Sequence, residues 1–491
     1  MKSLRHLLYT LCMSFAVAAV ISCDDDTFGT SPSLSLTFST DTVRLDTLFS
    51  TVPSSTRSFW VYNKSGDGIR CATVKQERGN QSGFRVNVHG IYLGQTNGYA
   101  TNEIEIRNKD SIRVYVEATL PNNYKGKPVS IEDNLVFTLE SGRQQKVNLN
   151  AFAWDARIMK NVVIKEDATL ATTDKPIVIY GGIDVKEGAT LTIAQGTTIY
   201  FHGDGGMEIS GKLICNGTQE APITLRGDRL DNMFDYLPYD NISGQWKGIH
   251  IKEGSYDNII SHTDIHGTYD GIVADSSDVT KTKLTIENSI VHNCQGYGLM
   301  SVNSKLIVNN CQLTNTLKDC LFADGGDVTV NNTTMAQFYP FDSKRGYAIH
   351  FSAANHPLLN LNCANSIITG YGNDELSVES DAESNNANEF NFSNCLIRTP
   401  KITTDDSIRF TRVEYEDVED TIAYGAKNFK LVDGNKQRYD FRLSAKSHAI
   451  GLADKESALP CDRLGTKRDD QPDAGAYEYV EEENSLTKTN L

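Results

Sequence analysis

The sequence has no local pattern typical of a zinc or thiol redox site, and it is short of basic residues. Its ten cysteines include no Cys-x-x-Cys pair, and its ten histidines are not spaced around any cysteine pair as zinc ligands are. The 47 lysines and arginines are outnumbered by 63 acidic residues, which gives a formal net charge of −16. Because no basic cluster offsets this charge, we expect neither nucleic acid nor anionic lipid headgroups as partners.

Long apolar runs are also missing, apart from one near the N-terminus. Residues 7–20 form an apolar run that follows Lys2 and Arg5. This run is too short, and too closely followed by acidic residues, to span a bilayer. Residues 1–22 are therefore predicted to be an export signal.

The end of this signal, Val20–Cys23, resembles a bacterial lipobox, in which the cysteine is lipidated and becomes the first residue. Asp24–Asp26 then open an acidic linker over residues 23–33, which is similar to the surface-export tag of Bacteroidetes lipoproteins. The resemblance implies a protein that is lipid-anchored at Cys23 in the outer membrane and faces outward. An ordinary secretory signal, or an anchor facing the periplasm, is the alternative.

The eight cysteines that follow are predicted to pack as small apolar residues, because a free buried cysteine behaves as a small hydrophobe. Disulfides are compatible with an exported protein, and the sequence leaves their formation open. These cysteines are Cys71, Cys215, Cys294, Cys311, Cys320, Cys363, Cys395 and Cys461.

Residues 34–156 contain short segments of alternating apolar and polar residues, separated by Gly, Asn and Asp turns. Examples are Phe59–Tyr62, Phe84–Val88 and Ile112–Val116. About seven such strands over about 120 residues is the number found in an immunoglobulin-like β-sandwich. The region resembles the N-terminal sandwiches that precede β-helices in Bacteroidetes lipoproteins, and we expect it to act as a spacer.

One eight-residue phrase occurs three times at a step of 22 residues, as Leu284–Val291, Leu306–Leu313 and Val328–Met335. A fixed period of this kind in strand-rich sequence indicates a solenoid. Each phrase alternates apolar and polar residues, breaks at an asparagine and resumes, as two short strands meeting at a corner would. The corner residues are expected to take the left-handed conformation and to bond one another in a ladder. They are Asn288, Asn310 and Asn332.

A small inward-facing slot is predicted directly after each corner, filled by Ser289, Cys311 and Thr333. The whole pattern resembles the right-handed parallel β-helix family, which includes pectate lyases, polygalacturonases and many surface proteins. The resemblance implies a β-helix over 161–400, an irregular cap over 401–479 that packs back on the last coils, and a disordered tail over 480–491. The predicted fold class is all-β: an N-terminal immunoglobulin-like β-sandwich followed by a right-handed parallel β-helix.

The catalytic signatures of enzymes in this family are not found in the predicted β-helix. Polygalacturonase-like members need clustered aspartates with Gly-His-Gly and Arg-x-Lys, and pectate-lyase-like members need acidic calcium ligands with an arginine base. Neither set can be placed, so no cofactor is expected. Calcium is compatible with the turns Gly203–Gly206 and Asp324–Asp327, but turn geometry alone explains their residues.

Aligned coils nevertheless supply four candidate catalytic residues. His266 and His292 follow the corner phrase by one step in successive coils, so they are expected to lie one above the other on the surface. There they could act as a general base or bind a metal, but no carboxylate is evident to orient them, and solvated side chains are the alternative. Lys318 and Arg345 fall in register on a neighbouring turn and could act as base and charge neutraliser in a lyase.

An insertion at Gly227–Trp246 interrupts the coil pattern and provides the candidate ligand-binding residues. Aromatic rings beside carboxylates suit stacking on sugars and hydrogen bonding to their hydroxyls. The alternative is a structural loop whose rings pack on the flank of the helix, with its arginine bonded to a neighbouring aspartate. The candidates are Arg229, Phe234, Tyr236, Tyr239 and Trp246.

These features together predict a cell-surface lipoprotein whose β-helix binds glycans, or serves as an adhesin or structural protein, without catalysis. The alternative is a polysaccharide lyase or glycoside hydrolase that acts in a groove on the β-helix. The expected partners are the outer membrane, through the lipid anchor, and polysaccharides or surface glycans. Because geometry and packing explain the corner residues, function is expected where the period breaks.

Overall fold

The computed structural model describes residues 27–172, 174–234, 236–380 and 386–481. Its elements are β-strands and short 3₁₀ helices, and the chain divides into two compact units between Asp155 and Ala156. No helix among the described residues has the length and apolar character needed to cross a bilayer. The predicted signal, the lipidation site Cys23 and nearly all of the predicted tail lie outside the described residues.

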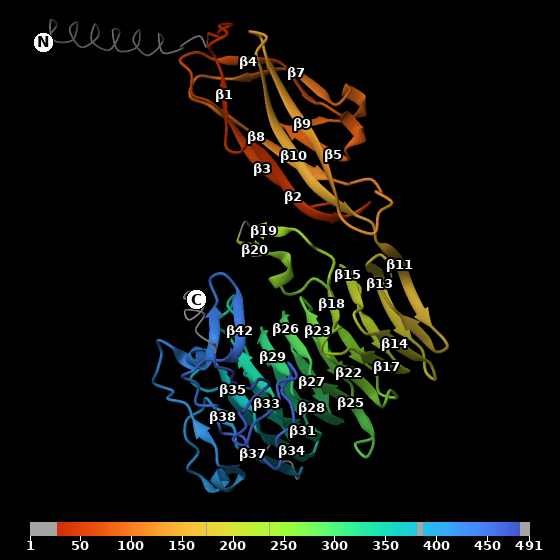
Figure 1. The fold of residues 1–491 in the computed structure, drawn as a ribbon, viewed down its shortest axis with the longest axis vertical. Coiled ribbons are helices and arrows are strands. Elements are labelled where there is room, and N and C mark those ends of the chain that lie inside the picture. The colour runs from red at the N-terminus through yellow and green to blue at the C-terminus, as the bar shows by residue number, and fades with distance from the viewer. Residues whose placement is uncertain (1–26, 173, 235, 381–385, 482–491) are drawn as a thin grey trace, which may run out of the picture. The chain divides into compact units, whose positions relative to one another are not determined.

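The first unit is a β-sandwich of two five-stranded sheets (Figure 1). One sheet has the order β1 (Leu36–Phe38), β3 (Arg57–Asn63), β8 (Ser111–Ala118), β5 (Phe84–Val88) and β6 (Ile91–Leu93). The other has the order β2 (Thr42–Phe49), β10 (Gln144–Trp154), β9 (Val129–Leu139), β4 (Ile69–Gln76) and β7 (Ala100–Ile106). β2 pairs with β10 in parallel, and the other pairs in these sheets are antiparallel. Two 3₁₀ turns, η1 (Gly79–Gln81) and η2 (Gln95–Asn97), lie between the strands.

Strict alternation of side chains builds the core of the sandwich. In β8, Ile112, Val114 and Val116 are buried, whereas Arg113 and Tyr115 point to the outer face. Successive residues of a strand point to opposite faces, so each sheet presents one apolar face to the other. Residues of both sheets join in one apolar cluster, which confirms the predicted two-sheet sandwich.

The second unit is a parallel β-helix whose coils each contribute a short strand to three faces. β11 (Arg157–Ile164) and β13 (Ile177–Val185) open it. The first face consists of β16 (Met207–Ile209), β21 (Ile249–Ile251), β24 (Ile272–Ala274), β27 (Leu299–Val302), β30 (Leu321–Asp324), β33 (Ile349–Ser352) and β36 (Leu376–Glu379).

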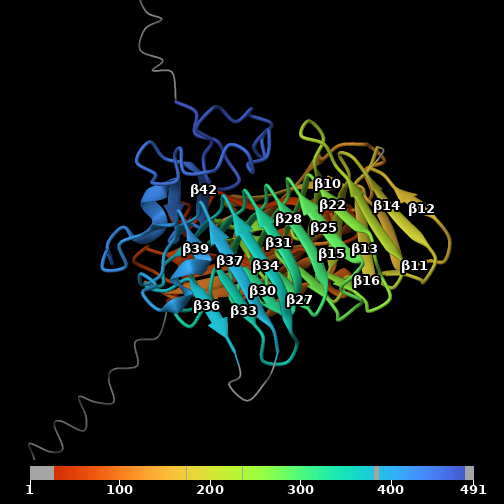
Figure 2. The same cartoon turned by 90° about the horizontal axis from the view of Figure 1, so that it is seen from below.

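The second face is a ten-stranded sheet, which Figure 2 shows as a ladder running from yellow to blue in chain order. Its strands are β12 (Ala168–Leu170), β14 (Thr190–Ala194), β17 (Lys212–Asn216), β22 (Asn258–Ser261), β25 (Thr282–Glu287), β28 (Lys305–Asn309), β31 (Gly326–Asn331), β34 (Leu358–Ala364), β37 (Asn388–Ser393) and β39 (Phe410–Thr411). The third face consists of β15 (Thr198–His202), β18 (Ile223–Gly227), β23 (Thr263–His266), β26 (Ile290–Cys294), β29 (Gln312–Thr316), β32 (Thr334–Gln337), β35 (Ile367–Gly370), β38 (Leu396–Ile397) and β40 (Glu414–Tyr415).

The eight-residue phrases are the strands of the second and third faces, with the corner between them. Leu284 pairs with Leu306, and Leu306 with Val328, so equivalent apolar residues stack in one column inside the coil. These side chains are at most 1% exposed. The predicted solenoid is therefore confirmed, and its parallel strands extend to β40, beyond the predicted end at residue 400.

The corner asparagines have the predicted left-handed backbone. Asn288, Asn310 and Asn332 have φ of 51°, 51° and 47°, and Asn365 and Asn394 continue the series at 50° and 52°. Asparagine tolerates this region better than most residues because its short amide can bond locally. One residue type therefore turns five successive coils.

The slot after each corner is inward and buried as predicted, and it also carries hydrogen bonds. Ser289 Oγ accepts the backbone N–H of Thr263 in the preceding coil at 3.0 Å, and Thr333 Oγ1 accepts that of Cys311 at 3.3 Å. Ser366 Oγ accepts that of Thr333 at 3.1 Å. A small hydroxyl therefore satisfies a buried donor that the corner leaves without a ladder partner.

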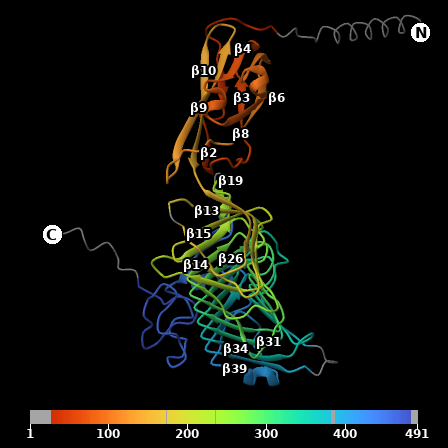
Figure 3. The ribbon, with the colours of Figure 1, turned by 90° about the vertical axis from the view of Figure 1, so that its right-hand side faces the viewer.

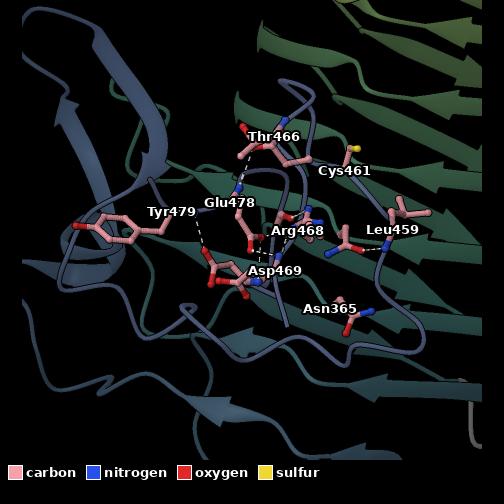
Figure 4. A network of polar contacts seen from close by, with 12 residues as sticks. Asn365, Leu459, Cys461, Thr466, Arg468, Asp469, Glu478 and Tyr479 are labelled. Carbon is pink, nitrogen blue, oxygen red and sulfur yellow. Dashed lines mark hydrogen bonds and ion pairs between the residues drawn. The ribbon is translucent and has the colours of Figure 1, made fainter. Parts of the chain in front are cut away.

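The predicted amide ladder is largely replaced by contacts with the C-terminal segment, which runs along one flank of the coils (Figure 3). Asn310 Nδ2 donates to Asn288 Oδ1 at 3.2 Å, but it also donates to Cys461 O at 2.8 Å. Asn332 Oδ1 accepts from Leu459 N at 2.9 Å (Figure 4). The corner amides point outward, so the segment that covers them competes for the same donors and acceptors.

This segment contacts the late coils, as predicted, where Gly475 N donates to Asn365 O at 2.8 Å, and it also reaches farther back along the helix. Arg468 Nη2 donates to Asn310 Oδ1, and Tyr477 Oη donates to Gln312 Oε1 at 2.6 Å, both in a coil near the middle of the helix. Before this segment lie η4 (Asp405–Arg409), η5 (Tyr424–Asn428) and a hairpin of β41 (Phe429–Asp433) and β42 (Arg438–Leu443). A second apolar cluster, which includes Phe338, Phe429 and Phe441, joins this region to the third face.

The eight described cysteines are all free, and seven of them are buried. Burial raises the pKa of the Cys215 and Cys311 thiols to about 12, so both are neutral at pH 7. They pack as small apolar groups in the coil interior, as predicted.

Candidate functional site

The outward side chains of the first face form a line of apolar and aromatic groups. Val273 in β24 pairs with Met300 in β27, Met300 with Phe322 in β30, and Phe322 with His350 in β33. Each of the four is half-buried. Adjacent strands are about 4.8 Å apart, so this line repeats once per coil along the helix axis.

A second column lies in the turns just before these strands and alternates aspartate with tyrosine. Asp270 Oδ1 accepts the backbone N–H of Tyr297 in the next coil at 2.8 Å. Two coils on, Asp319 Oδ1 accepts that of Tyr347 at 2.7 Å. A Cβ at Gly296 would collide with the Asp270 carboxylate, so a glycine is needed before this tyrosine.

The tyrosines of this column contact the first-face line. The Tyr297 ring stacks on Phe322 with centroids 5.4 Å apart, and Lys318 Nζ lies 4.6 Å from the Tyr297 ring centre. Tyr347 meets His350 edge-on at 5.7 Å. Burial, with the nearby charges of Asp319 and Asp270, raises the pKa of Tyr297, so its hydroxyl remains a neutral donor.

The N-terminal members of these columns, Val273, Met300, Asp270 and Tyr297, line an open groove with a cavity of about 720 Å³. The lining includes Tyr269, Tyr297, Met300 and Lys318, together with His250 near its N-terminal end. Tyr269 is 50% exposed. The groove therefore offers aromatic surface beside charged groups, which is the composition of many sugar sites.

Three charged side chains converge around His250. Lys252 Nζ lies 2.8 Å from His250 Nδ1, and His250 Nε2 lies 2.8 Å from Asp275 Oδ1. Lys252 Nζ also lies 2.5 Å from Glu208 Oε2. Imidazole, ammonium and carboxylate in contact can move protons in a reaction.

His266 and His292 lie one above the other on the third face. The prediction that His266 is exposed at the surface is wrong, and so is the prediction that it has no carboxylate to orient it. The two residues pair in register, with ring centroids 4.8 Å apart. His266 is only 6% exposed. Its Nδ1 lies 2.8 Å from Asp264 Oδ1 and its Nε2 lies 2.8 Å from Asp240 Oδ1. Asp264 stands two residues before His266, and Asp240 comes from the insertion. The alignment of coils that places His266 beside His292 therefore does not identify these two carboxylates.

The carboxylates control the protonation of this pair. Burial alone would lower the pKa of His266, but Asp264 and Asp240 outweigh it and raise the pKa to about 9. Burial would likewise raise the pKa of Asp264, but the two imidazoles hold it well below its usual range. Without another cation, His266 is therefore an imidazolium at neutral pH. Asp264, His266 and His292 are also a set of side chains that could hold a metal ion.

Trp246 is not available to a ligand, which corrects its place among the candidate binding residues. It is 2% exposed, and its ring stacks on Phe201 with centroids 4.2 Å apart. Its Nε1 donates to His266 O at 2.8 Å. Trp246 bridges to Thr268 of the next coil, so at this residue the insertion has already rejoined the helix.

Two other candidates of the insertion bind each other within the loop. Arg229 donates from Nε and Nη2 to the Asp231 carboxylate, both at 2.8 Å, and its guanidinium lies 3.9 Å from the Tyr239 ring centre. Phe234 and Tyr236 are 52% and 55% exposed and stack on each other at 5.8 Å. Phe234 ends β19 (Asn232–Phe234) and Tyr236 directly precedes β20 (Leu237–Pro238), its partner in a hairpin that η3 (Tyr239–Asn241) follows.

Lys318 and Arg345 have different surroundings. Lys318 is exposed at the groove, whereas Arg345 Nη1 donates to Tyr339 O at 3.3 Å and Asp342 O at 2.9 Å. The Arg345 guanidinium also lies 5.0 Å from the Tyr371 ring centre. Arg345 therefore holds a loop, while Lys318 is placed to meet a ligand.

The groove residues Tyr297 and His250, and Phe322, which stacks on Tyr297, are absent from the sequence-based candidates. The repeat contains a signal for the tyrosine. The residue two positions before β24, β27, β30 and β33 is, in turn, Asp270, Tyr297, Asp319 and Tyr347. Reading that signal requires the first-face strands to be aligned, and these are only three or four residues long.

A protein-family model described as a right-handed β-helix region matches residues 161–335. No curated protein matches the chain. The solved structures that resemble it include a family 123 glycoside hydrolase from Clostridium perfringens, described in a study of glycolipid glycan hydrolysis, at 10% identity and a TM-score of 0.19. The match covers 28% of this chain and 30% of that one. A PapD-like domain of human CEP192 matches at 10% identity and a TM-score of 0.18, over 26% of this chain and 90% of that domain. Scores this low carry no argument about function.

Proposed function

We propose that this protein binds an extended polysaccharide in the first-face groove, without cleaving it. The observation that carries the proposal is the line of Tyr297, Phe322 and Tyr347 in successive coils, which starts in the groove beside the exposed Tyr269 and continues past the groove lining along the first face. A sugar ring presents an apolar face to an aromatic side chain and hydroxyls around its edge to polar groups. A site that repeats along the helix axis suits a ligand that also repeats.

The charges of the groove favour a ligand with both hydroxyl and anionic groups. Lys318 is exposed beside the Tyr297 ring, and Lys247 also lines the cavity. One oxygen of Asp270 accepts the backbone N–H of Tyr297, so its other oxygen faces the groove, whereas the second oxygen of Asp319 lies 3.0 Å from His350 Nδ1. An acidic polysaccharide would meet the lysines, and its hydroxyls would meet Asp270.

The test is binding to a panel of neutral and acidic polysaccharides, followed by calorimetry with the best ligand. Tyr297→Ala and Phe322→Ala should each weaken binding by roughly 1 kcal/mol or more, the scale of an aromatic contact. Phe341→Ala, at a 53% exposed ring outside the groove lining, is the matched control and should bind as the wild type does. Equal losses in all three variants, or no ligand in the panel, would contradict the proposal.

A second candidate function, polysaccharide cleavage, is favoured by the contacts of His250 with Lys252 and Asp275 at the end of the same groove. A lyase or hydrolase needs a proton acceptor and donor beside the bound sugar. Incubation with each bound polysaccharide, followed by detection of unsaturated ends and new reducing ends, separates the two functions. Cleavage that His250→Ala abolishes while binding persists would replace the binding proposal.

We also propose that the chain is exported and anchored in the outer membrane through Cys23, with the groove accessible from outside. The proposal rests on the sequence Val20–Cys23 and the acidic residues that follow it. Labelling with a fatty-acid analogue should mark the wild type and not Cys23→Ser. Protease treatment of intact cells should digest the protein, and full protection would place it on the periplasmic side.

A further inference from the structure

Three side chains bring metal-type donor atoms to one point on the third face. Asp264 Oδ1 lies 2.8 Å from His266 Nδ1 and 3.1 Å from His292 Nε2. All three donor atoms lie within 4.8 Å of one another. Ligands bind zinc at about 2.0–2.2 Å, which places two ligand atoms of one tetrahedral ion roughly 3.3 Å apart. The observed separations are close to that value, so small side-chain movements would admit an ion.

The second nitrogen of His266 is bound in the way that metal-ligating histidines usually are. Its Nε2 lies 2.8 Å from Asp240 Oδ1, and Arg226 Nη1 holds the same oxygen at 2.7 Å. A ligating histidine almost always donates its other N–H to a carboxylate or carbonyl, which fixes the ring and leaves the first nitrogen free for the metal. Asp240 performs this task for Nε2 and leaves Nδ1 directed toward Asp264.

The fixed charges around the cluster also suit a cation. Asp240 and Asp264 are two carboxylates, and Arg226 is the one guanidinium in contact with them. Apart from the imidazoles, these side chains therefore leave one negative charge for a bound cation to balance.

Both imidazoles converge on a single oxygen of Asp264, which brings two ring nitrogens and a carboxylate oxygen to one point. Hydrogen bonds hold the three side chains together without a metal, and the same two imidazoles and carboxylate form a donor set typical of zinc, cobalt or iron. We propose that Asp264, His266 and His292 bind one divalent transition-metal ion, with Asp240 orienting His266 and at least one coordination position left for water or a ligand. This site lies on the third face and does not depend on the groove proposal.

The test uses the full chain, stripped with a chelator and then titrated separately with Zn²⁺ and Co²⁺. The wild type should bind one ion per chain, and the cobalt form should show the strong visible absorption of a tetrahedral site. His292→Gln and Asp264→Asn should lose at least 100-fold in affinity and lose that spectrum. Asp240→Asn should weaken binding by roughly 10- to 100-fold but keep the spectrum, because Asp240 acts only through His266.

The matched control is His356→Ala. His356 Nδ1 lies 3.1 Å from the Asp324 carboxylate, so it offers an imidazole beside an acid without a second imidazole. This variant should bind metal as the wild type does. Thermal unfolding of every variant in the presence of chelator shows whether it is folded before metal is added. A wild type that binds less than one ion per chain, or equal affinity in the wild type, His292→Gln and Asp264→Asn, would overturn the proposal.

Discussion

Replacing Arg468 by methionine should release the C-terminal segment from the coils. Arg468 is 6% exposed, and its Nη1 donates to Glu478 Oε2 and Asp473 O, both at 2.9 Å. Its Nη2 donates to Gly475 O at 2.8 Å and to Asn310 Oδ1 at 3.2 Å (Figure 4). Breaking a buried ion pair from one side costs about 3–5 kcal/mol, because the remaining charge stays buried without its partner. A loss of this size exceeds what most surface contacts contribute.

The assay is hydrogen exchange of residues 450–480, because this segment can open locally while the coils remain folded. A cost of 3–5 kcal/mol corresponds to exchange about 100- to 5,000-fold faster there. The double variant Arg468→Met with Glu478→Gln removes both charges, keeps an acceptor for the backbone N–H groups of Asp469 and Asp473, and should recover most of the protection. Lys455→Met is the control, since Lys455 and Asp470 form a pair with side chains 64% and 91% exposed, and it should change little. Unchanged exchange in Arg468→Met, or equal exchange in the single and double variants, would refute this account of the docking.

Three further predictions concern the coils. Trp246→Ala removes a buried ring that stacks on Phe201. The free energy of unfolding, measured by urea titration, should fall by about 3–5 kcal/mol, and a loss below about 1 kcal/mol would show that the ring is not part of the core. Asn310→Gly should be less destabilising than Asn310→Ala by about 1 kcal/mol, because φ of 51° strains alanine and not glycine, and equal losses would exclude backbone strain as the cause. Burial lowers the pKa of Lys283 in the folded protein to about 8, from 10.5. Between pH 8 and pH 10.5 the unfolded chain therefore binds more protons than the folded protein, and the free energy of unfolding should rise with pH across that window by about 3 kcal/mol. Lys283→Met should flatten this part of the stability profile, and identical profiles would contradict the assignment.

The fold could be predicted from the sequence because its signals are local and repeated. The phrase beginning at Leu284 recurs with its apolar positions and its asparagine in place, so each copy supports the others. The amide contacts of Asn310 could not be predicted, because Cys461 and Arg468 come from more than 150 residues away. Sequence spacing specifies which residues share a coil and does not specify which distant segment covers it.

The candidate site residues also divide into those that the repeat places and those that come from segments outside the repeat. His266 and His292 could be placed together because both follow the corner phrase. Asp240 could not be added to them, because it comes from an insertion without a period. Trp246 was misplaced for a related reason, since composition assigns it to an aromatic loop and only the bridge to Thr268 shows that the coil has resumed.

The structure also changes where function should be sought on this β-helix. The sequence favoured places where the period breaks, because the corner asparagines and the slot residues are accounted for by geometry and packing. The groove residues are instead part of the period: Asp270 and Tyr297 occupy one position of successive coils, and the aspartate holds the backbone of the tyrosine. A coil needs its corner and its interior for stability. Repetition places equivalent side chains of successive coils about 4.8 Å apart, which is the regular spacing that the proposed binding of a repeating ligand requires. The insertion at Gly227–Trp246 contributes in a different way, because Asp240 reaches the Nε2 of His266, whose Nδ1 already contacts Asp264 of its own strand.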